Sequence, residues 1–287
     1  MLRENLVLSD GRTFEFTRNS IKSDSAIILH AGTMQDITGW KVWLDTFADN
    51  GLMAVAIGRS GYVASSPKPG RITIDIANDV SELADHLGIK RMVNVGLSGG
   101  GQHAIATGLD SRSVGVVTSG SLAPFEELGD DFYLGMQQAD LDEYADALRD
   151  INDLVKRFQG WLNKGADNSF TPKEVSANDK RAQASPSWKI LFDSCDLTMR
   201  AGWDWVADDY SSYLKPWGFD PRDVKVPVVI WQGGLDKNVP PQHGKWLAKH
   251  IPNSTLNLIE DESHVGLYIN YEREAMQSAM NLLKGNH

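Results

Sequence analysis

The chain has 287 residues, of which 41% are hydrophobic, and a formal net charge of −10. This length and apolar content can bury a sizeable core, in one large domain or two small ones. An acidic surface repels phosphate backbones and anionic lipid headgroups, so we expect neither nucleic acid nor a membrane as a partner.

Six short, β-rich apolar runs follow one another along the chain, at residues 26–30, 53–57, 92–95, 114–117, 226–231 and 255–259. Several are almost continuously apolar, which is typical of strands buried on both faces of a parallel sheet. Apolar residues recur at three- and four-residue steps over residues 77–87, where Gly88 is suited to end a helix, and again over residues 275–283. This alternation predicts an α/β sheet with helices on both faces.

The alternation of strands and helices breaks between residues 124 and 217. Apolar residues there predict one long amphipathic helix over residues 141–158, and five of the nine tryptophans lie in this region. We expect a helical cap at residues 124–217, inserted into a core of residues 1–123 and 218–287. In open α/β folds, ligands bind at the C-terminal edge of the sheet, where we place the cap. Most of its tryptophans are expected to pack the cap, and others to line an apolar pocket.

The segment Gly96-Leu97-Ser98-Gly99-Gly100 fits the pattern G-x-S-x-G. It directly follows one predicted strand and precedes a helical stretch, as in a nucleophile elbow, where the serine hydroxyl stands at the end of the sheet. Glycines two residues to either side allow chain segments to pass without Cβ clashes. The alternative is a glycine-rich turn with a capping serine. We predict that Ser98 is a catalytic nucleophile.

A serine hydroxyl needs a base to take its proton at neutral pH. His264 follows the last predicted strand, which places it at the same edge of the sheet as Ser98. We predict that it is the base, the alternative being a surface-loop histidine. His30 ends an early strand and is better suited to a structural role, and His103 is expected to pack beneath the elbow.

The imidazole of the base must be held in one tautomer by an acid. Asp236 follows the fifth predicted strand, and the chain order serine, aspartate, histidine is typical of a strand-to-helix elbow site. Asp261 and Glu262 remain alternatives because they lie close to the histidine in sequence. Asp208 and Asp209 belong to the inserted region and are less suited. A simple turn aspartate is the other interpretation of Asp236.

Two backbone N–H groups are needed to hold the negative charge that develops on the substrate oxygen. The first predicted strand ends in Ala31-Gly32-Thr33, small residues whose backbone can approach a substrate. We predict that the N–H groups of Thr33 and Gly99 form the oxyanion hole. If the loop is shifted by one residue, Gly32 takes the place of Thr33.

Five segments resemble a bacterial α/β-hydrolase family. Its members carry a His-Gly-Thr-Pro-Gly oxyanion loop, an Asp-Arg-Pro-Gly-Tyr-Gly turn and a Gly-His-Ser-Gly-Gly-Gly elbow. The corresponding segments are residues 31–35, 58–63 and 96–101, with further matches at residues 215–220 and 234–240. The resemblance implies the α/β-hydrolase fold, a mostly parallel central sheet flanked by helices with an inserted helical cap. It also implies a Ser-Asp-His triad and hydrolytic chemistry.

The sequence departs from that family's motifs near the expected site. Ala31 stands where the oxyanion loop has histidine, and Met34-Gln35 stands where it has Pro-Gly. Gly58 removes a carboxylate that usually lies beneath the site, and Leu97 replaces a histidine beside the nucleophile. These departures leave all three triad residues in place and bear on the substrate and the rate.

The expected activity is hydrolysis of an ester or related carbonyl small molecule through an acyl-enzyme, with no metal or organic cofactor. One alternative is carbon–carbon bond hydrolysis or perhydrolase chemistry with the same triad. Another is a catalytically weak ligand-binding or sensor protein on the same fold. The stretch Gly99-Gly100-Gly101 lacks the spacing of a dinucleotide site and the lysine of a P-loop.

The composition also bears on location. The single cysteine, Cys195, cannot form an intrachain disulfide or a paired-thiol zinc site. The N-terminus has no apolar segment typical of a signal peptide, and no apolar run approaches the roughly 20 residues of a membrane span. We therefore expect a cytoplasmic protein. The sequence does not predict its oligomeric state.

Overall fold

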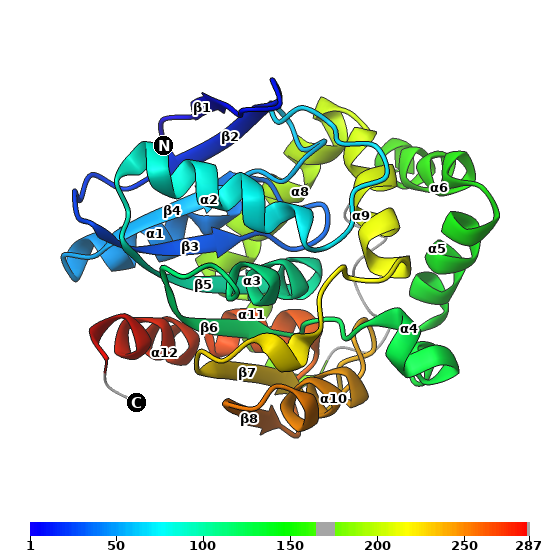
Figure 1. Ribbon diagram of the computed structural model, residues 1–287. Helices are drawn as coiled ribbons and strands as arrows, with labels where there is room; N and C mark the ends of the chain where they lie inside the picture. The colour runs from blue at the N-terminus through cyan, green and yellow to red at the C-terminus, as the bar shows by residue number, and fades with distance from the viewer. Residues whose placement is uncertain (165–175, 286–287) are drawn as a thin grey trace.

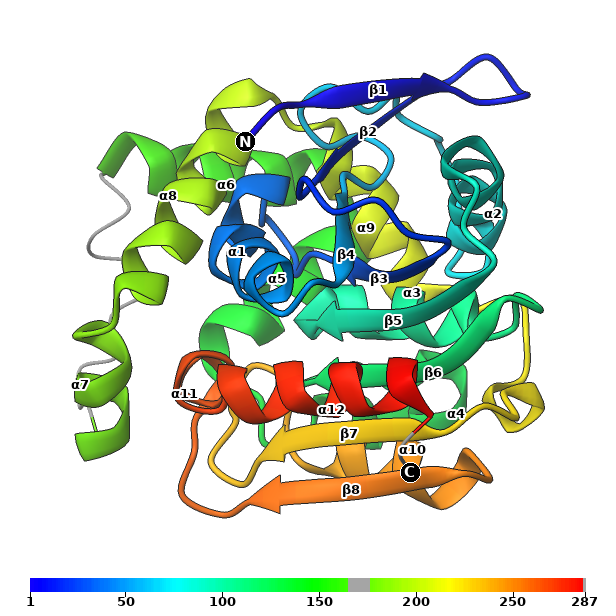
Figure 2. The ribbon, with the colours of Figure 1, turned by 90° about the vertical axis from the view of Figure 1, so that its left-hand side faces the viewer.

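The computed structural model describes residues 1–164 and 176–285. Within these residues, eight strands form one sheet in the order β1-β2-β4-β3-β5-β6-β7-β8 (Figure 2). The strands are β1 Glu4–Val7, β2 Thr13–Arg18, β3 Ser25–His30, β4 Met53–Ile57, β5 Arg91–Leu97, β6 Ser113–Ser119, β7 Val228–Gly233 and β8 Ser254–Ile259. Strand β2 is antiparallel to both of its neighbours, and β4, β3, β5, β6, β7 and β8 run parallel.

The six predicted apolar runs correspond to β3 through β8. In β3, Ala26 and Ile28 pack on one face of the sheet, whereas Ile27 and Leu29 pack on the other. This alternation follows from the two-residue period of a strand, and burial of both faces explains the nearly continuous apolar sequence. The two N-terminal strands were not predicted.

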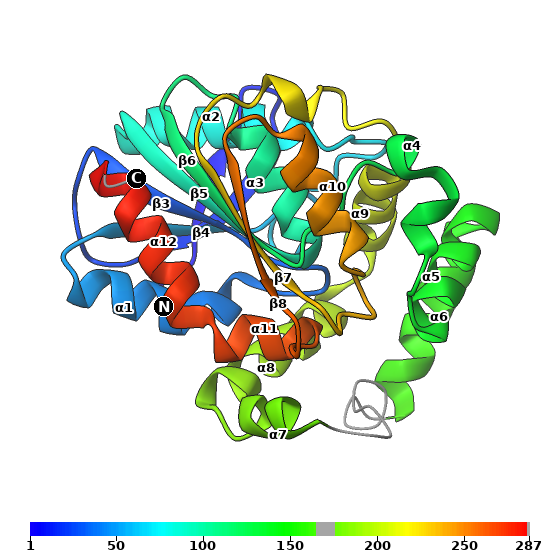
Figure 3. The same ribbon diagram turned by 90° about the horizontal axis from the view of Figure 1, so that it is seen from below.

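Helices cover both faces of the sheet (Figure 3). One face carries α1, Lys41–Asp49, and α12, Glu272–Lys284, whose apolar residues join one core cluster with the sheet. The other face carries α2 Asp75–Leu87, α3 Gly101–Thr107 and α10 Gln242–His250. The short helix α11, His264–Asn270, precedes α12. This two-layer covering is the predicted α/β architecture.

Every described element between α3 and β7, apart from β6, is helical. We define the helical segment as α4 Phe125–Leu128, α5 Gln138–Arg149, α6 Ile151–Lys164, α7 Ala177–Gln183, α8 Pro186–Ala201 and α9 Asp204–Leu214. In Figure 1, α5 and α6 lie on the opposite side of the protein from the C-terminal helix α12. The division of the chain into a core and a cap at residues 124–217 stays a proposal.

The prediction of a single long helix over residues 141–158 was wrong. Asp150 adopts an extended conformation, with φ −161° and ψ 120°, and separates α5 from α6. Its carboxylate accepts a hydrogen bond from the N–H of Asn152 at 2.9 Å. An aspartate that bonds the amides of a following turn is typical of a helix start, so the local capping preference interrupts the apolar period.

The helical segment has its own aromatic core. Phe158 of α6 stacks on Trp205 of α9, with ring centroids 5.5 Å apart. The Trp205 ring also contacts Tyr62 in the loop after β4, with centroids 5.6 Å apart. These contacts join the helical segment to the loop after β4. Among residues 1–164 and 176–285, no helix combines the length and apolar character needed to cross a bilayer.

Candidate active site

The structure brings Ser98, His264 and Asp236 together at the C-terminal ends of three parallel strands. Ser98 follows β5, Asp236 lies in the loop after β7, and His264 opens α11 after β8. The His264 Nε2 atom lies 3.0 Å from Ser98 Oγ, and its Nδ1 atom lies 2.6 Å from Asp236 Oδ2. A hydroxyl, an imidazole and a carboxylate thus form one hydrogen-bonded line, the arrangement of a nucleophile, its base and an orienting acid.

Ser98 occupies a strained turn. Its φ of +49° lies in the left-handed region, which is unfavourable for a residue with a side chain. The chain enters the turn from β5 and leaves it through a 3-10 helix, Ser98–Gly100, that continues into α3. A Cβ atom at Gly100 would collide with the carbonyl oxygens of His30 and Ala31. Glycine is therefore required here for the close approach of the loop after β3.

The carboxylate of Asp236 is fixed on both oxygens. Its Oδ1 atom accepts hydrogen bonds from the backbone N–H groups of Asn238 at 2.9 Å and Val239 at 2.8 Å. Its Oδ2 atom accepts from His264, and Asp236 is only 2% exposed. A buried carboxylate that is itself fixed by these donors holds the imidazole ring of His264 in one orientation, with Nε2 turned toward Ser98.

The alternative bases and acids lie elsewhere. Burial lowers the pKa of His30 to about 3, and its Nε2 atom lies 3.5 Å from Asn94. His103 is buried against Arg71, so both histidines have structural surroundings, as expected.

The acidic alternatives to Asp236 bond to other partners. Asp261 accepts a hydrogen bond from Asn178 at 3.0 Å, and Glu262 accepts from Arg181 at 3.0 Å. Asp208 accepts from the backbone N–H of Lys68 at 2.7 Å. Asp236 is the acid that contacts His264 in the described structure.

Asp209 lies at the centre of a buried ionic cluster. Arg59 donates to both of its oxygens, at 3.2 and 2.6 Å, and Arg71 forms a second ion pair with it. The hydroxyls of Tyr62 and Tyr213 also donate to Asp209. Burial alone disfavours the carboxylate, but the two guanidinium groups outweigh burial and hold the pKa of Asp209 below its ordinary value.

This ionic cluster supports the loop after β3. Arg59 donates hydrogen bonds to the carbonyl oxygens of Ala31 and Gly32. The Gly32 N–H donates to Gln35 Oε1 at 2.9 Å, and the Met34 N–H donates to the Tyr62 hydroxyl at 3.1 Å. The backbone on both sides of Thr33 is thereby fixed by side chains.

A cavity of about 820 Å³ opens at Ser98 and His264. Its wall combines the loop after β3, the ends of the sheet and residues of the helical segment. Of the five tryptophans between residues 124 and 217, Trp161 and Trp188 line the cavity, while Trp205 and Trp217 are buried in the protein interior. The volume is suited to a small molecule of drug-like size.

Two carboxyl groups of α5 also line this cavity. Burial raises the pKa of Asp140 to about 6, and Asn238 donates a hydrogen bond to it at 3.1 Å. Burial and then the Asp140 carboxylate raise the pKa of Glu143 to about 8, and the Tyr210 hydroxyl donates to Glu143. These surroundings favour the protonated form of Glu143.

Tyr268 is a site residue that the sequence did not reveal. It lies one helical turn after His264 in α11, and its hydroxyl is 2.6 Å from His264 Nε2. The spacing of four residues on a helix is the one signal that could have placed it beside the histidine.

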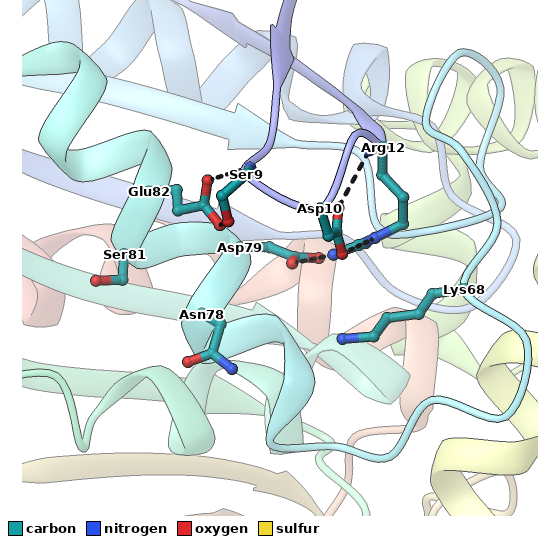
Figure 4. Close-up of a pocket in the computed structure, with 8 residues that line it drawn as sticks. All are labelled: Ser9, Asp10, Arg12, Lys68, Asn78, Asp79, Ser81 and Glu82. Carbon is teal, nitrogen blue, oxygen red and sulfur yellow. Dashed lines mark hydrogen bonds and ion pairs between the residues drawn. The ribbon is translucent and has the colours of Figure 1, made fainter.

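A second hollow lies between the turn after β1 and helix α2 (Figure 4). Within it, Arg12 forms an ion pair with Asp79 at 2.5 Å, and Ser9 donates a hydrogen bond to Glu82 at 2.7 Å. It shares no lining residue with the cavity at Ser98. In the part of the chain that the structure describes, no group of three or more histidine, cysteine, aspartate or glutamate side chains is arranged to hold a metal ion.

A family model described as "alpha/beta hydrolase fold" matches residues 26–271. The chain belongs to the α/β hydrolase fold family. The matched residues include β3 from its second residue, the Ser98 turn, the helical segment and His264. The mostly parallel sheet with helices on both faces is the α/β-hydrolase fold that the sequence predicted.

Solved α/β hydrolases share this fold over nearly their whole length. A thermophilic esterase from Thermogutta terrifontis is 18% identical, with 100% of both chains covered and a TM-score of 0.71. A bromoperoxidase from Bacillus anthracis is 20% identical, covering 98% of this chain and 100% of its own, with a TM-score of 0.71. An enol-lactonase from Burkholderia xenovorans is 17% identical over 98% and 100%, with a TM-score of 0.69. At these identities, the similarity shows the shared fold.

Proposed function

We propose that the protein is a serine hydrolase that cleaves small esters through an acyl-enzyme on Ser98. The observation that carries the proposal is the line of hydrogen bonds from Ser98 Oγ to His264 Nε2, at 3.0 Å, and from His264 Nδ1 to Asp236, at 2.6 Å. A base within hydrogen-bond distance of a hydroxyl, itself held by a buried acid, is what nucleophilic catalysis by serine requires.

In the first half-reaction, Ser98 Oγ attacks the ester carbonyl carbon while His264 Nε2 takes the hydroxyl proton. The tetrahedral intermediate collapses, the bond to the leaving alcohol breaks, and His264 returns the proton to the alcohol oxygen. In the second half-reaction, water attacks the acyl-enzyme with His264 again as base. Asp236 stays ionised and stabilises the imidazolium in both steps.

The N–H groups of Thr33 and Gly99 are proposed to hold the oxyanion. The Gly32 N–H is committed to Gln35, which favours Thr33 over Gly32 as the donor from this loop. The Arg59 bonds to the Ala31 and Gly32 carbonyl oxygens support the loop from beneath. Donors fixed in advance stabilise the developing charge without reorganisation during the reaction.

The cavity favours a small, largely apolar ester. Aromatic side chains such as Trp188 and Tyr144 share its wall with Lys237 and with Glu143, whose raised pKa favours its neutral form. The similarity in fold to an esterase and an enol-lactonase supports acyl chemistry on this scaffold. Carbon–carbon bond hydrolysis and perhydrolysis with the same triad would share the first chemical requirement, an activated Ser98.

Turnover of a series of p-nitrophenyl esters with acyl chains of two to eight carbons tests the proposal. The wild type, Ser98→Ala and His264→Ala are compared. We expect hydrolysis by the wild type and a fall in kcat of about three to six orders of magnitude in each variant, because these residues act as a unit. Equal slow hydrolysis by all three proteins would favour the ligand-binding alternative and contradict the proposal.

A further inference from the structure

The hydroxyl of Tyr268 stands at the reacting atoms but has no place in the triad. It lies 2.6 Å from His264 Nε2 and 3.4 Å from Nδ1, and the two rings meet edge to face with centroids 4.6 Å apart. The phenol also interacts with the side chain and backbone of Ser98. Tyr268 lines the cavity beside Ser98 and His264.

Two hydroxyls therefore compete for one nitrogen. Because Nδ1 donates its hydrogen to Asp236, the neutral imidazole has a single lone pair, at Nε2. The Tyr268 hydroxyl is closer to Nε2, at 2.6 Å, than Ser98 Oγ, at 3.0 Å. In the free enzyme, the Tyr268 hydroxyl is therefore hydrogen-bonded to the same nitrogen with which a substrate has to interact.

The leaving-group oxygen of the substrate must also approach His264 Nε2. To accept the proton from His264, the oxygen has to come within about 2.6–3.2 Å of Nε2. Tyr268 already lies within that distance on the wall of the cavity. Once Nε2 is protonated, it no longer accepts a hydrogen bond. The Tyr268 O–H is then free to donate a hydrogen bond to the leaving-group oxygen.

The surroundings keep this hydroxyl in place as a donor. Burial, followed by the charge of Asp236, raises the pKa of Tyr268 well above 10, so the phenol retains its proton. Gly120 leaves room for the ring, since a Cβ atom there would lie 3.0 Å from both Tyr268 Oη and His264 Cε1. The φ of Gly120 is +58°, which further favours glycine.

We propose that Tyr268 is a further catalytic residue, whose hydroxyl donates a hydrogen bond to the leaving-group oxygen during acylation. This inference rests on the proposed acyl-enzyme function. The Ser98 Oγ–carbon bond forms and the carbon–oxygen bond to the alcohol breaks. The Ser98 proton passes through His264 Nε2 to the alcohol oxygen, while Tyr268 keeps its own proton and stabilises the negative charge on the departing oxygen.

The dependence of the rate on the leaving group tests the role of Tyr268. Phenyl acetate and p-nitrophenyl acetate share one acyl group, but p-nitrophenolate leaves readily without help. For Tyr268→Phe we expect kcat/KM to fall about tenfold to a hundredfold with phenyl acetate, the worth of one hydrogen bond to a charged group. With p-nitrophenyl acetate the fall should stay below about threefold, because little charge needs stabilising.

Tyr271→Phe is the matched control, since Tyr271 packs beside Trp231 at 6.0 Å between centroids and does not line the cavity. It should leave both rates unchanged. An equal fall for both esters in Tyr268→Phe would overturn the proposal and indicate a loss of ring positioning. An unchanged or faster rate would also overturn it, because the hydroxyl would then be idle or obstructive.

Failure of the proposed function would look different. In that case Ser98→Ala would hydrolyse both esters as fast as the wild type, whatever residue stands at position 268. If Ser98→Ala is inactive while Tyr268→Phe shows no dependence on the leaving group, the triad stands and the role of Tyr268 is rejected.

Discussion

Asp209 of α9 and Arg59 of the loop after β4 form a buried ion pair, 2.6 Å between Oδ2 and a terminal nitrogen. The two residues are separated by 150 positions in the sequence and are almost completely inaccessible to solvent. Because Arg59 also donates hydrogen bonds to the carbonyl oxygens of Ala31 and Gly32, the pair connects the helical segment to the loop that carries the proposed oxyanion donor.

Asp209→Asn should destabilise the protein strongly. The substitution keeps the size of the side chain but leaves Arg59 and Arg71 as buried cations without their carboxylate. We expect the free energy of unfolding, measured by urea titration, to fall by about 3–5 kcal/mol. The control is Asp196→Asn, which breaks an exposed pair with Arg200 on α8 and should leave the free energy of unfolding nearly unchanged. Similar losses in both variants would show that the buried cluster carries no special weight.

Glu143→Gln should make stability less dependent on pH. The pKa of Glu143 is raised to about 8, mainly by burial, so the folded protein holds a proton that the unfolded chain releases above pH 4.5. The wild type therefore loses stability as the pH rises from about 4.5 to 8, and the loss stays constant above that range. Glutamine resembles the protonated acid and does not titrate.

The variant and the wild type should thus unfold at similar urea concentrations at pH 5. At pH 9 the Glu143→Gln protein should be more stable by about 1 kcal/mol or more, given that one pKa unit corresponds to about 1.4 kcal/mol. Glu274→Gln, at an exposed position in α12, is the control and should follow the wild type at both pH values. A difference that is the same at pH 5 and pH 9 would contradict a raised pKa at position 143.

Gly99→Ala should damage the proposed oxyanion hole. A Cβ atom at position 99 would collide with the Tyr213 hydroxyl and with Thr33 Oγ1, which lie 2.7 Å from each other. The collision displaces Thr33, so kcat/KM for p-nitrophenyl acetate should fall about a hundredfold or more, the typical cost of one lost oxyanion donor. Gly160→Ala in α6 has nothing within 4 Å of the new methyl group and should leave the rate unchanged. Full activity in Gly99→Ala would place the oxyanion elsewhere.

Asp236→Asn and Asp261→Asn compare the predicted acid with one of the carboxylates that the sequence left as alternatives. Asp236 contacts His264 Nδ1 at 2.6 Å, whereas Asp261 bonds Asn178 at 3.0 Å. We expect kcat of Asp236→Asn to fall about ten-thousandfold, because the amide no longer holds the imidazole in its tautomer. Asp261→Asn should stay within about twofold of the wild type. A larger loss in Asp261→Asn than in Asp236→Asn would reverse the assignment of the acid.

The sequence predicted the six strands that are buried on both faces, because such strands are almost continuously apolar. It missed β1 and β2 at the edge of the sheet. In β1, exposed and partly buried residues alternate, and Val7 is 70% exposed, so no apolar run marks this strand. The single predicted helix over residues 141–158 failed at Asp150, where side-chain capping outweighs apolar periodicity.

The three proposed triad residues could be predicted because each follows a strand, and parallel strands bring their C-terminal ends to one edge. Tyr268 carries no such mark, since its position depends on how α11 is seated beside the Ser98 turn. The pairing of Asp209 with Arg59 and Arg71 depends on how the helical segment meets the sheet, which no local pattern encodes.

Covalent labelling tests the central claim most directly. The wild type, Ser98→Ala and His264→Ala are treated with a fluorophosphonate, and the modified residue is mapped by peptide mass spectrometry. Stoichiometric modification of Ser98 in the wild type, no adduct in Ser98→Ala and much slower labelling of His264→Ala are the predicted results, because the imidazole at 3.0 Å activates the hydroxyl. An unmodified Ser98 in the wild type, or equal labelling of all three proteins, would contradict the account.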